Sequence, residues 1–194
     1  MRYLSTISSA KVSAFLNDLE AYEASTDQVL ENARVNPHGL LSPDQRITSA
    51  EIKKIMLEAV RLTNNEDLGL LQGEKISRGI SNILGYVLLN CATLGEAAEK
   101  YCKYERIVDG TSITELKLDG SQYHIAITTT DDILANVRQF LDFKLSGIMA
   151  YAKLLTGRKI APVKACLSYE RTKNTKHHER VFDCPVYLEK NAIC

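Results

Sequence analysis

The sequence predicts an α+β protein. A helical N-terminal half precedes a β-hairpin, a long helix and two further strands, and the strands form a small antiparallel sheet. Apolar side chains in the first hundred residues recur at the three- and four-residue spacing of amphipathic helices. Beyond them, residues 113–118 and 123–128 are rich in Ile, Leu, Thr and Tyr, as strands are. We expect a division near residues 105–112, between a helical subdomain over 1–108 and a ββαββ subdomain over 109–194, the two together forming one domain.

Capping-box patterns mark where three helices of the first half begin, because a Ser or Thr is followed three residues later by Gln or Glu. These pairs are Ser25 with Gln28, Thr48 with Glu51, and Thr93 with Glu96. Apolar stripes over 12–19 and 80–88 predict two further helices. A short helix over Asp67–Gln72 is expected to be closed by Gly73. Gly69, Gly73 and Gly79 all fall at expected helix ends, where capping explains them better than a phosphate-binding loop does.

The second half opens with a hairpin, since Asp119-Gly120 favours a type I′ turn between the two strands. The longest helix is expected over Asp131–Leu155, with Asp131 and Asp132 at the positive end of its dipole. Further strands are expected at Val163–Tyr169 and Pro185–Leu188. A short helical turn near Glu179–Phe182 is expected between them.

Composition places the chain among soluble globular proteins. Its 194 residues fit one domain or two small ones, at roughly 150 residues per domain. The 24 basic and 24 acidic side chains cancel, which argues against a stand-alone nucleic-acid binder. No apolar run approaches the roughly 20 residues of a membrane span, and no signal peptide is recognisable. We therefore expect a cytoplasmic protein with no membrane partner, whose five cysteines are free thiols.

Catalytic and metal-binding motifs are weak or absent. The sequence contains no GxGxxG, GxxxxGK[ST], GxSxG or HExxH motif. His177 and His178 have no third ligand at a typical zinc spacing, so polar surface histidines are the better interpretation. Cys91 and Cys102 fall on expected helices beside apolar neighbours, where inert packing is usual, although a Cys/His nucleophile pair stays open. We predict no catalytic residue, no metal and no cofactor.

A basic segment runs from Lys153 to Arg180, with eight Lys or Arg against two Glu. It is either a solvated face or a patch that binds an anion or a partner.

Several motifs, in order and spacing, resemble a known family. They are Leu41–Ile47 (LSPDQRI), Ala59–Thr63 (AVRLT), Asp67–Leu70 (DLGL), Gly85-Tyr86, Thr93–Ala97 (TLGEA), Leu154–Gly157 (LLTG), Phe182–Val186 (FDCPV) and Asn191. Together they resemble the N-terminal regulatory domain of AraC-type transcription regulators, in the branch labelled "arabinose-binding" that includes the ornithine-utilisation regulators. The resemblance runs from about residue 8 to residue 194.

The resemblance implies a domain that senses a small effector and mediates dimerisation. DNA binding is then left to a C-terminal pair of helix-turn-helix units that is absent from this chain. We accordingly expect the sensing fragment of a longer regulator. The family's Phe-Gly-x-Pro is Phe182-Asp183-Cys184-Pro185 here, which predicts a left-handed turn that tolerates a side chain. Tyr169 stands where the family usually has a histidine. No binding residue is carried over from the family.

The effector is expected between the helical half and the hairpin–helix–strand half, because concave sites favour such junctions. The candidate pocket residues are Tyr86, Tyr101, His124, Arg138 and Tyr169. The tyrosines would supply apolar rings with a polar handle. Arg138 could pair with the carboxylate of an amino-acid-like effector or organic acid, although a surface cation is the simpler interpretation.

The leading hypothesis is thus a non-catalytic effector-sensing and homodimerisation domain that meets DNA only through the absent helix-turn-helix domain. Two alternatives stay open. The first is a purely structural dimerisation module, whose isologous interface would be the long helix. The second is an enzyme of unknown type, which would need a strongly perturbed titratable pair in an apolar cleft.

Overall fold

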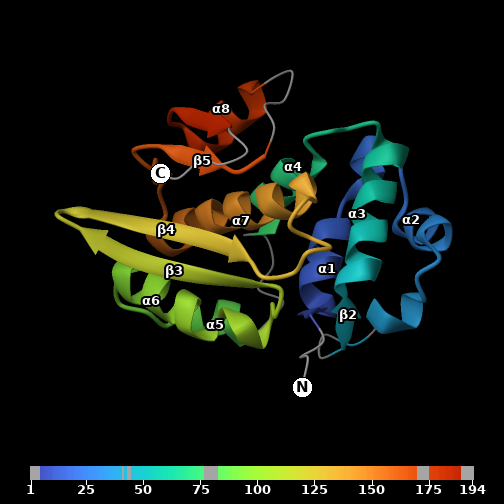
Figure 1. The fold of residues 1–194 in the computed structure, drawn as a ribbon, viewed down its shortest axis with the longest axis horizontal. Coiled ribbons are helices and arrows are strands. Elements are labelled where there is room, and N and C mark those ends of the chain that lie inside the picture. The colour runs from blue at the N-terminus through green and yellow to red at the C-terminus, as the bar shows by residue number, and fades with distance from the viewer. Residues whose placement is uncertain (1–4, 41, 43–44, 77–82, 170–174, 189–194) are drawn as a thin grey trace.

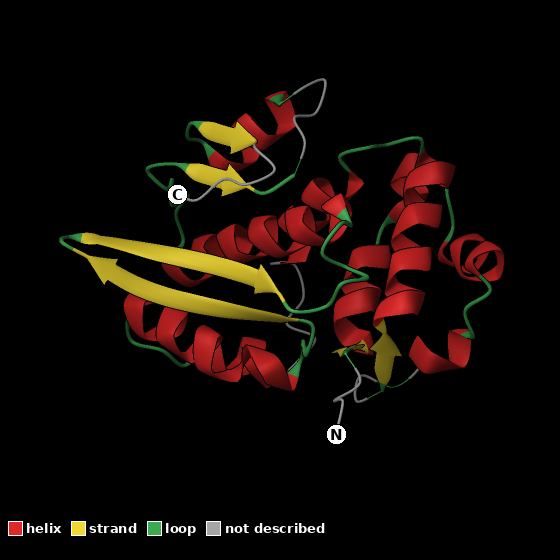
Figure 2. Ribbon diagram, in the orientation of Figure 1, coloured by secondary structure: helices red, strands yellow, loops and turns green. Residues whose placement is uncertain are grey.

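The computed structural model describes residues 5–40, 42, 45–76, 83–169 and 175–188, and it confirms the α+β class (Figures 1 and 2). The first part contains β1 (Thr6–Ser8), α1 (Ser9–Leu16), the 3-10 helices η1 (Leu19–Tyr22) and η2 (Pro37–Leu40), α2 (Thr26–Ala33), β2 (Arg46–Thr48), α3 (Ser49–Thr63), α4 (Leu68–Lys75), α5 (Ile83–Leu89), α6 (Leu94–Tyr104) and the 3-10 helix η4 (Glu105–Ile107). The second part contains β3 (Ser112–Asp119), β4 (Gln122–Thr129), α7 (Arg138–Thr156), β5 (Ala165–Leu167), α8 (Lys176–Phe182) and β6 (Val186–Leu188).

Helix α7 runs through the middle of the molecule (Figure 1). Helices α1 to α3 lie at one end, and the β3–β4 hairpin with α5 and α6 lies at the other. The largest apolar core joins the two parts, since Phe140 and Phe143 of α7 pack in one cluster with Phe15 of α1 and Ile52 of α3. The division expected near residues 105–112 stays a prediction, but the parts on either side of it share this core.

The expected helix caps formed at all three capping-box positions. The side chains of Ser25, Thr48 and Thr93 each accept a hydrogen bond from the backbone N–H three residues later. At Thr48 the box is reciprocal, because Glu51 Oε2 accepts from the Thr48 backbone N–H at 2.9 Å. The predicted left-handed turn at Asp183 is also confirmed, with φ of 56°.

The strands form three separate pairs instead of one antiparallel sheet (Figure 2). β3 and β4 make the expected antiparallel hairpin, which turns at Gly120 with φ of +58°. β1 and β2, which the sequence did not predict, pair antiparallel within the first part. β5 and β6 pair parallel, so the expectation of a single antiparallel sheet was wrong. The reason is that helix α8 connects them, and a helical crossover returns the chain in the same direction.

The long helix begins at Arg138, seven residues later than expected. Asp131 caps a turn that precedes it, because Asp131 Oδ1 accepts from the backbone N–H groups of Ile133 at 2.9 Å and Leu134 at 3.0 Å. Asp131 Oδ2 also accepts from Ser49 Oγ at 2.8 Å, which ties this turn to α3. Lys153 is the one exposed residue of α7, and the other residues of the helix are buried or half-buried. Much of the helix is thus covered by the chain itself, and its role as a dimer interface stays a prediction.

Two glycines of α4 act through packing and not as caps, contrary to the expectation. A Cβ atom on Gly69 would lie 2.3 Å from the backbone oxygen of Gln139 in α7. A Cβ atom on Gly73 would lie 1.8 Å from Ser146 Oγ and 2.6 Å from the backbone oxygen of Phe143. Both residues lie within α4, which extends to Lys75. Their missing side chains let α4 and α7 approach closely, whereas Gly79 lies outside the described residues, as do residues 80–82 of another expected helix.

Cys91, Cys102 and Cys184 are free thiols, as expected. Cys166 is disulfide-bonded, so the expectation of free thiols was wrong there. Within the described ranges, no helix has the length and apolar character needed to cross a bilayer.

Candidate functional site

The structure brings together two of the five candidate residues, Arg138 and Tyr169, at the start of α7. Arg138 Nε donates to Asp142 Oδ2 at 3.1 Å, and a second guanidinium nitrogen donates to Asp67. The guanidinium carbon also lies 5.6 Å from the centre of the Tyr169 ring, a cation–π arrangement. Its charge is therefore already compensated by two carboxylates of the chain itself.

The same cluster fastens α8 to α7. The Tyr169 hydroxyl donates to Asp142 Oδ1, and its oxygen lies 2.9 Å from Nε2 of His178 in α8. His178 is fully buried, so its interpretation as a surface histidine was wrong. Burial and the Asp142 charge raise the pKa of Tyr169 far above its ordinary value, so the hydroxyl stays protonated and can donate. His177, beside it, has Nδ1 2.9 Å from Asp67 Oδ2. These contacts hold the C-terminal elements in place, and they leave Arg138 little capacity for a ligand.

The other three candidates lie elsewhere. Tyr86 is 58% exposed on α5. His124 lies on β4 opposite Lys117 of β3, on the hairpin face that does not carry Leu116 and Ile125. Tyr101 lies on α6 and donates its hydroxyl to Glu105 Oε1 at 3.1 Å. The five residues therefore do not form a single pocket.

A second polar cluster, which we call the charge network, is buried between α1, η4 and α7. It contains Lys144, Glu105 and Asp109, whose side chains are 0%, 1% and 0% exposed, and Lys11 at 13%. Lys144 Nζ lies 2.6 Å from Glu105 Oε1 and 3.1 Å from Asp109 Oδ2. Lys11 Nζ donates to the same Asp109 oxygen at 2.7 Å. Two cations and two anions thus balance in a largely buried site.

The pKa shifts follow from this arrangement. Burial opposes the charge on Asp109, but Lys11 and Lys144 outweigh burial and hold the pKa of this carboxyl well below its usual range. Burial alone would lower the pKa of Lys11, but the charges of Asp109 and Glu105 outweigh it and raise this pKa. Burial and the neighbouring Lys11 lower the pKa of Lys144. Burial and Glu105 also raise the pKa of Tyr101.

A cavity of about 40 Å³ lies beside the charge network. Its apolar lining includes Ala14, Leu84, Val108, Phe143 and Ile148, and its polar lining is Lys11, Tyr101, Lys144 and Tyr151. All of these residues except Val108, which follows η4, come from α1, α5, α6 and α7, so the cavity lies between elements of the two predicted subdomains. A mainly apolar wall with a few polar groups is typical of a small-molecule site.

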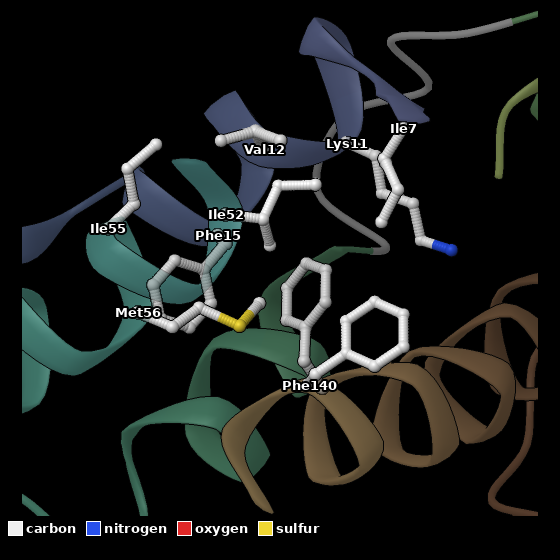
Figure 3. A pocket seen from close by; sticks show the side chains of 9 residues that line it. Ile7, Lys11, Val12, Phe15, Ile52, Ile55, Met56 and Phe140 are labelled. Atoms are coloured by element: carbon white, nitrogen blue, oxygen red, sulfur yellow. The ribbon is translucent and has the colours of Figure 1, made fainter. Parts of the chain in front are cut away.

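A smaller void of about 10 Å³ lies deeper, between α1, α3 and α7. Figure 3 shows its lining, with Met56 and Phe140 at its centre and the Lys11 ammonium directed away from Ile55 and Met56. Lys11 and Phe143 line both this void and the cavity. The two spaces are therefore separated by these side chains.

Sequence reasoning selected Tyr101 from the cavity wall and missed the charge network. Lysines and carboxylates on helices usually face solvent, so Lys11, Glu105 and Asp109 gave no signal. Lys144 could have been noticed, because it stands between Phe143 and Leu145 in the apolar part of a helix.

The basic segment is partly neutralised. Lys159 lies 3.2 Å from Asp183 Oδ2, and Arg180 forms a bidentate pair with Glu74. Arg171 and Lys173 lie outside the described residues. The choice between a solvated face and an anion-binding patch therefore stays open.

The comparisons with known proteins show what class of domain this is. The sequence profile of a family described as "Arabinose-binding domain of AraC transcription regulator, N-term" matches residues 24–192. The chain belongs to this family, and the resemblance drawn from its motifs is confirmed.

One curated relative is the "Ornithine utilization regulator" of Pseudomonas aeruginosa, which is 27% identical over 186 residues. That match covers 93% of this chain and 53% of the relative. The chain thus spans about half the length of the curated relative that it matches.

Proposed function

We propose that this chain is the effector-sensing domain of an AraC-type transcription regulator, and that the effector binds in the cavity beside the charge network. The observation that carries this proposal is the cavity itself, which has a mainly apolar wall that also contains a buried ammonium and two tyrosines. The effector would be a small metabolite, either amino-acid-like or an organic acid. The name of the curated relative favours the first class and the lysine at the cavity wall favours the second.

The position of the cavity suggests how binding could be read out. Its wall includes α1 of the first part and α7 of the second, and the charge network connects the same two helices through Asp109. An effector that contacts both α1 and α7 would stabilise one arrangement of these two helices over another. It can shift that balance only by the difference of its affinity for the two arrangements. DNA binding by another domain of the regulator would follow the shift.

A thermal-shift panel tests this proposal. Amino acids, organic acids and neutral sugars are added to the purified chain, and at least one is expected to raise Tm by an amount that grows with the logarithm of its concentration above Kd. Ala14→Leu places a larger side chain in the cavity and should abolish the shift. Ser13→Leu, on the exposed side of the same helix, should retain it. A panel without a single ligand, or a shift that survives Ala14→Leu, would overturn the proposal.

We also propose that the chain forms a homodimer, and the β3–β4 hairpin offers a surface for it. Leu118, Tyr123 and Ile125 lie on one hairpin face and are 62%, 60% and 42% exposed. Glu99 and Lys103, one helical turn apart on α6, flank the groove that contains Leu118 and Tyr123. A twofold-related copy could therefore place each charge against its opposite. Sedimentation compares the wild type, Leu118→Asp and, as the control, Lys117→Asp on the opposite face. The wild type and the control should be dimers, and Leu118→Asp should be a monomer. A monomeric wild type would contradict this proposal.

DNA contact and catalysis are not proposed for this chain, and it is proposed to act in the cytoplasm. The basis is its membership of a family of regulator domains and its zero net charge. If its affinity for DNA fell steeply with salt, as phosphate contacts require, or if the purified chain turned over a substrate, this part of the proposal would be wrong.

A further inference from the structure

Among the described residues, the two carboxylates beside the cavity already accept hydrogen bonds from the chain, whereas one of the two lysines has donors to spare. Asp109 Oδ1 accepts from the backbone N–H and the hydroxyl of Thr111, at 2.9 and 2.6 Å. Asp109 Oδ2 accepts from Lys11 and Lys144. Glu105 Oε1 accepts from Tyr101 and is paired with Lys144, and Oε2 accepts from Thr114. Both buried carboxylates are therefore satisfied by the chain itself.

Lys144 and Lys11 differ in how many of their ammonium protons have an acceptor among the described residues. Lys144 Nζ contacts Glu105, Asp109 and Ser112, which accounts for its three protons. Among the described residues, Lys11 Nζ donates to Asp109 alone, so two of its three N–H groups have no acceptor there. Its side chain is 13% exposed and lines the cavity. A largely buried ammonium with spare donors is a binding position for an anion or another strong acceptor.

The cavity limits the rest of such a ligand. About 40 Å³ has room for about three water molecules at roughly 10–15 Å³ each. Ala14, Leu84 and Ile148 in its wall provide hydrocarbon contacts and no polar group. The body of the ligand must therefore be short and apolar.

We infer that the ligand of this cavity is a short-chain carboxylic acid whose carboxylate accepts hydrogen bonds from Lys11 Nζ and whose hydrocarbon tail lies against Ala14, Leu84 and Ile148. This inference rests on the proposed function and narrows it. A zwitterionic amino acid fits less well, because its ammonium group would meet carboxylates whose oxygens are already occupied. The ligand would then differ in class from the amino acid in the name of the curated relative.

Isothermal titration of the whole chain tests the inference with matched probes. Butyrate is compared with butyramide, which has the same tail without the charge, and with 2-aminobutyrate, which adds the ammonium. We expect butyrate to bind most tightly, by roughly tenfold to a hundredfold over butyramide, the range for a hydrogen bond to a charged group. Along the series from acetate to octanoate, affinity should pass through a maximum at a short member and then fall.

Lys11→Met removes the ammonium and retains most of the side-chain length. The substitution should weaken butyrate binding by roughly tenfold to a hundredfold and leave butyramide binding unchanged. Lys153→Met, at the exposed lysine of α7, is the matched control and should leave both unchanged. The comparison of butyrate with butyramide on the wild-type chain needs no variant, so it decides the question even where Lys11→Met does not fold.

The outcomes separate this inference from the proposed function. The inference is wrong if butyramide or 2-aminobutyrate binds as tightly as butyrate, or if a neutral sugar binds instead of butyrate. The proposed function still stands in these cases, provided that Ala14→Leu abolishes the binding. If no compound of any class binds the chain, both are wrong.

Discussion

A methyl group added to Gly73 should force α4 away from α7. In Gly73→Ala the new Cβ would lie 1.8 Å from Ser146 Oγ and 2.6 Å from the backbone oxygen of Phe143. The serine hydroxyl can rotate, but the carbonyl belongs to the backbone of α7 and cannot move without the helix. Relief of this clash therefore requires a shift between two helices that together hold the centre of the fold.

The magnitude follows from two opposing effects. Overpacking a tight contact typically costs about 1–3 kcal/mol, and a clash with backbone belongs at the upper end. Replacing a helical glycine with alanine raises the free energy of unfolding by about 1 kcal/mol, because alanine has the higher helix propensity. The net loss in the free energy of unfolding should be about 2 kcal/mol, which lowers Tm by roughly 4–8 °C for a chain of this size.

Gly95→Ala provides the matched control. Gly95 is also helical, in α6, but the nearest heavy atom to its added Cβ is Thr93 Oγ1 at 3.9 Å. This variant should be neutral or more stable by up to about 1 kcal/mol. Both are measured by urea denaturation followed by circular dichroism. If Gly73→Ala were as stable as Gly95→Ala, the close packing of α4 on α7 would be refuted.

Three further predictions concern the buried polar groups and a helix cap. Arg138→Met leaves the buried Asp142 without its cation and should cost about 3 kcal/mol of stability, measured by thermal denaturation, while the affinity of any cavity ligand stays unchanged. Asp109 has its pKa depressed by Lys11 and Lys144, so the stability it contributes is present above its ordinary value of 3.8 and is lost as pH falls below it. Asp109→Asn should therefore lose less stability than the wild type between pH 5 and pH 3, in urea denaturation at each pH. Thr48→Ala removes the capping hydroxyl of α3 and should cost about 1 kcal/mol in the same assay.

Each of these has an outcome that contradicts it. Arg138 would be a ligand group if its substitution weakened binding without lowering Tm. An Asp109→Asn variant with the wild-type slope of stability against pH would show that the carboxyl titrates normally. If Thr48→Ala were as stable as Ser13→Ala, which changes an exposed internal position of α1, the box would add nothing to the helix.

Local interactions were readable from the sequence. The caps at Ser25, Thr48 and Thr93 depend on residues three positions apart, and the hairpin depends on the Asp119-Gly120 turn between two apolar strands. Gly157, which ends α7 with φ of +69°, is another local feature of this kind. Neighbours in the chain are neighbours in space here, so a pattern of a few residues contains the whole interaction.

The candidate site could be predicted only in part. Tyr101 lies in the cavity wall, but Lys11 and Lys144 were absent from the sequence-based candidates. Nothing near Lys11 in the chain distinguishes it from a surface lysine. Its partner Asp109 is 98 residues away, and the two meet because the backbone at Asp109 bridges to Ile7 of β1, just ahead of α1.

The amino-acid sequence by itself determined the fold class, most helix starts, the hairpin and the family. Tertiary structure alone decided that β5 and β6 run parallel, that Gly69 and Gly73 serve packing, and that two lysines and two carboxylates meet beside a cavity. The physical reason is distance along the chain. A cap or a turn is formed by adjacent residues, whereas burial of a charge or contact between two helices depends on segments that meet only after folding.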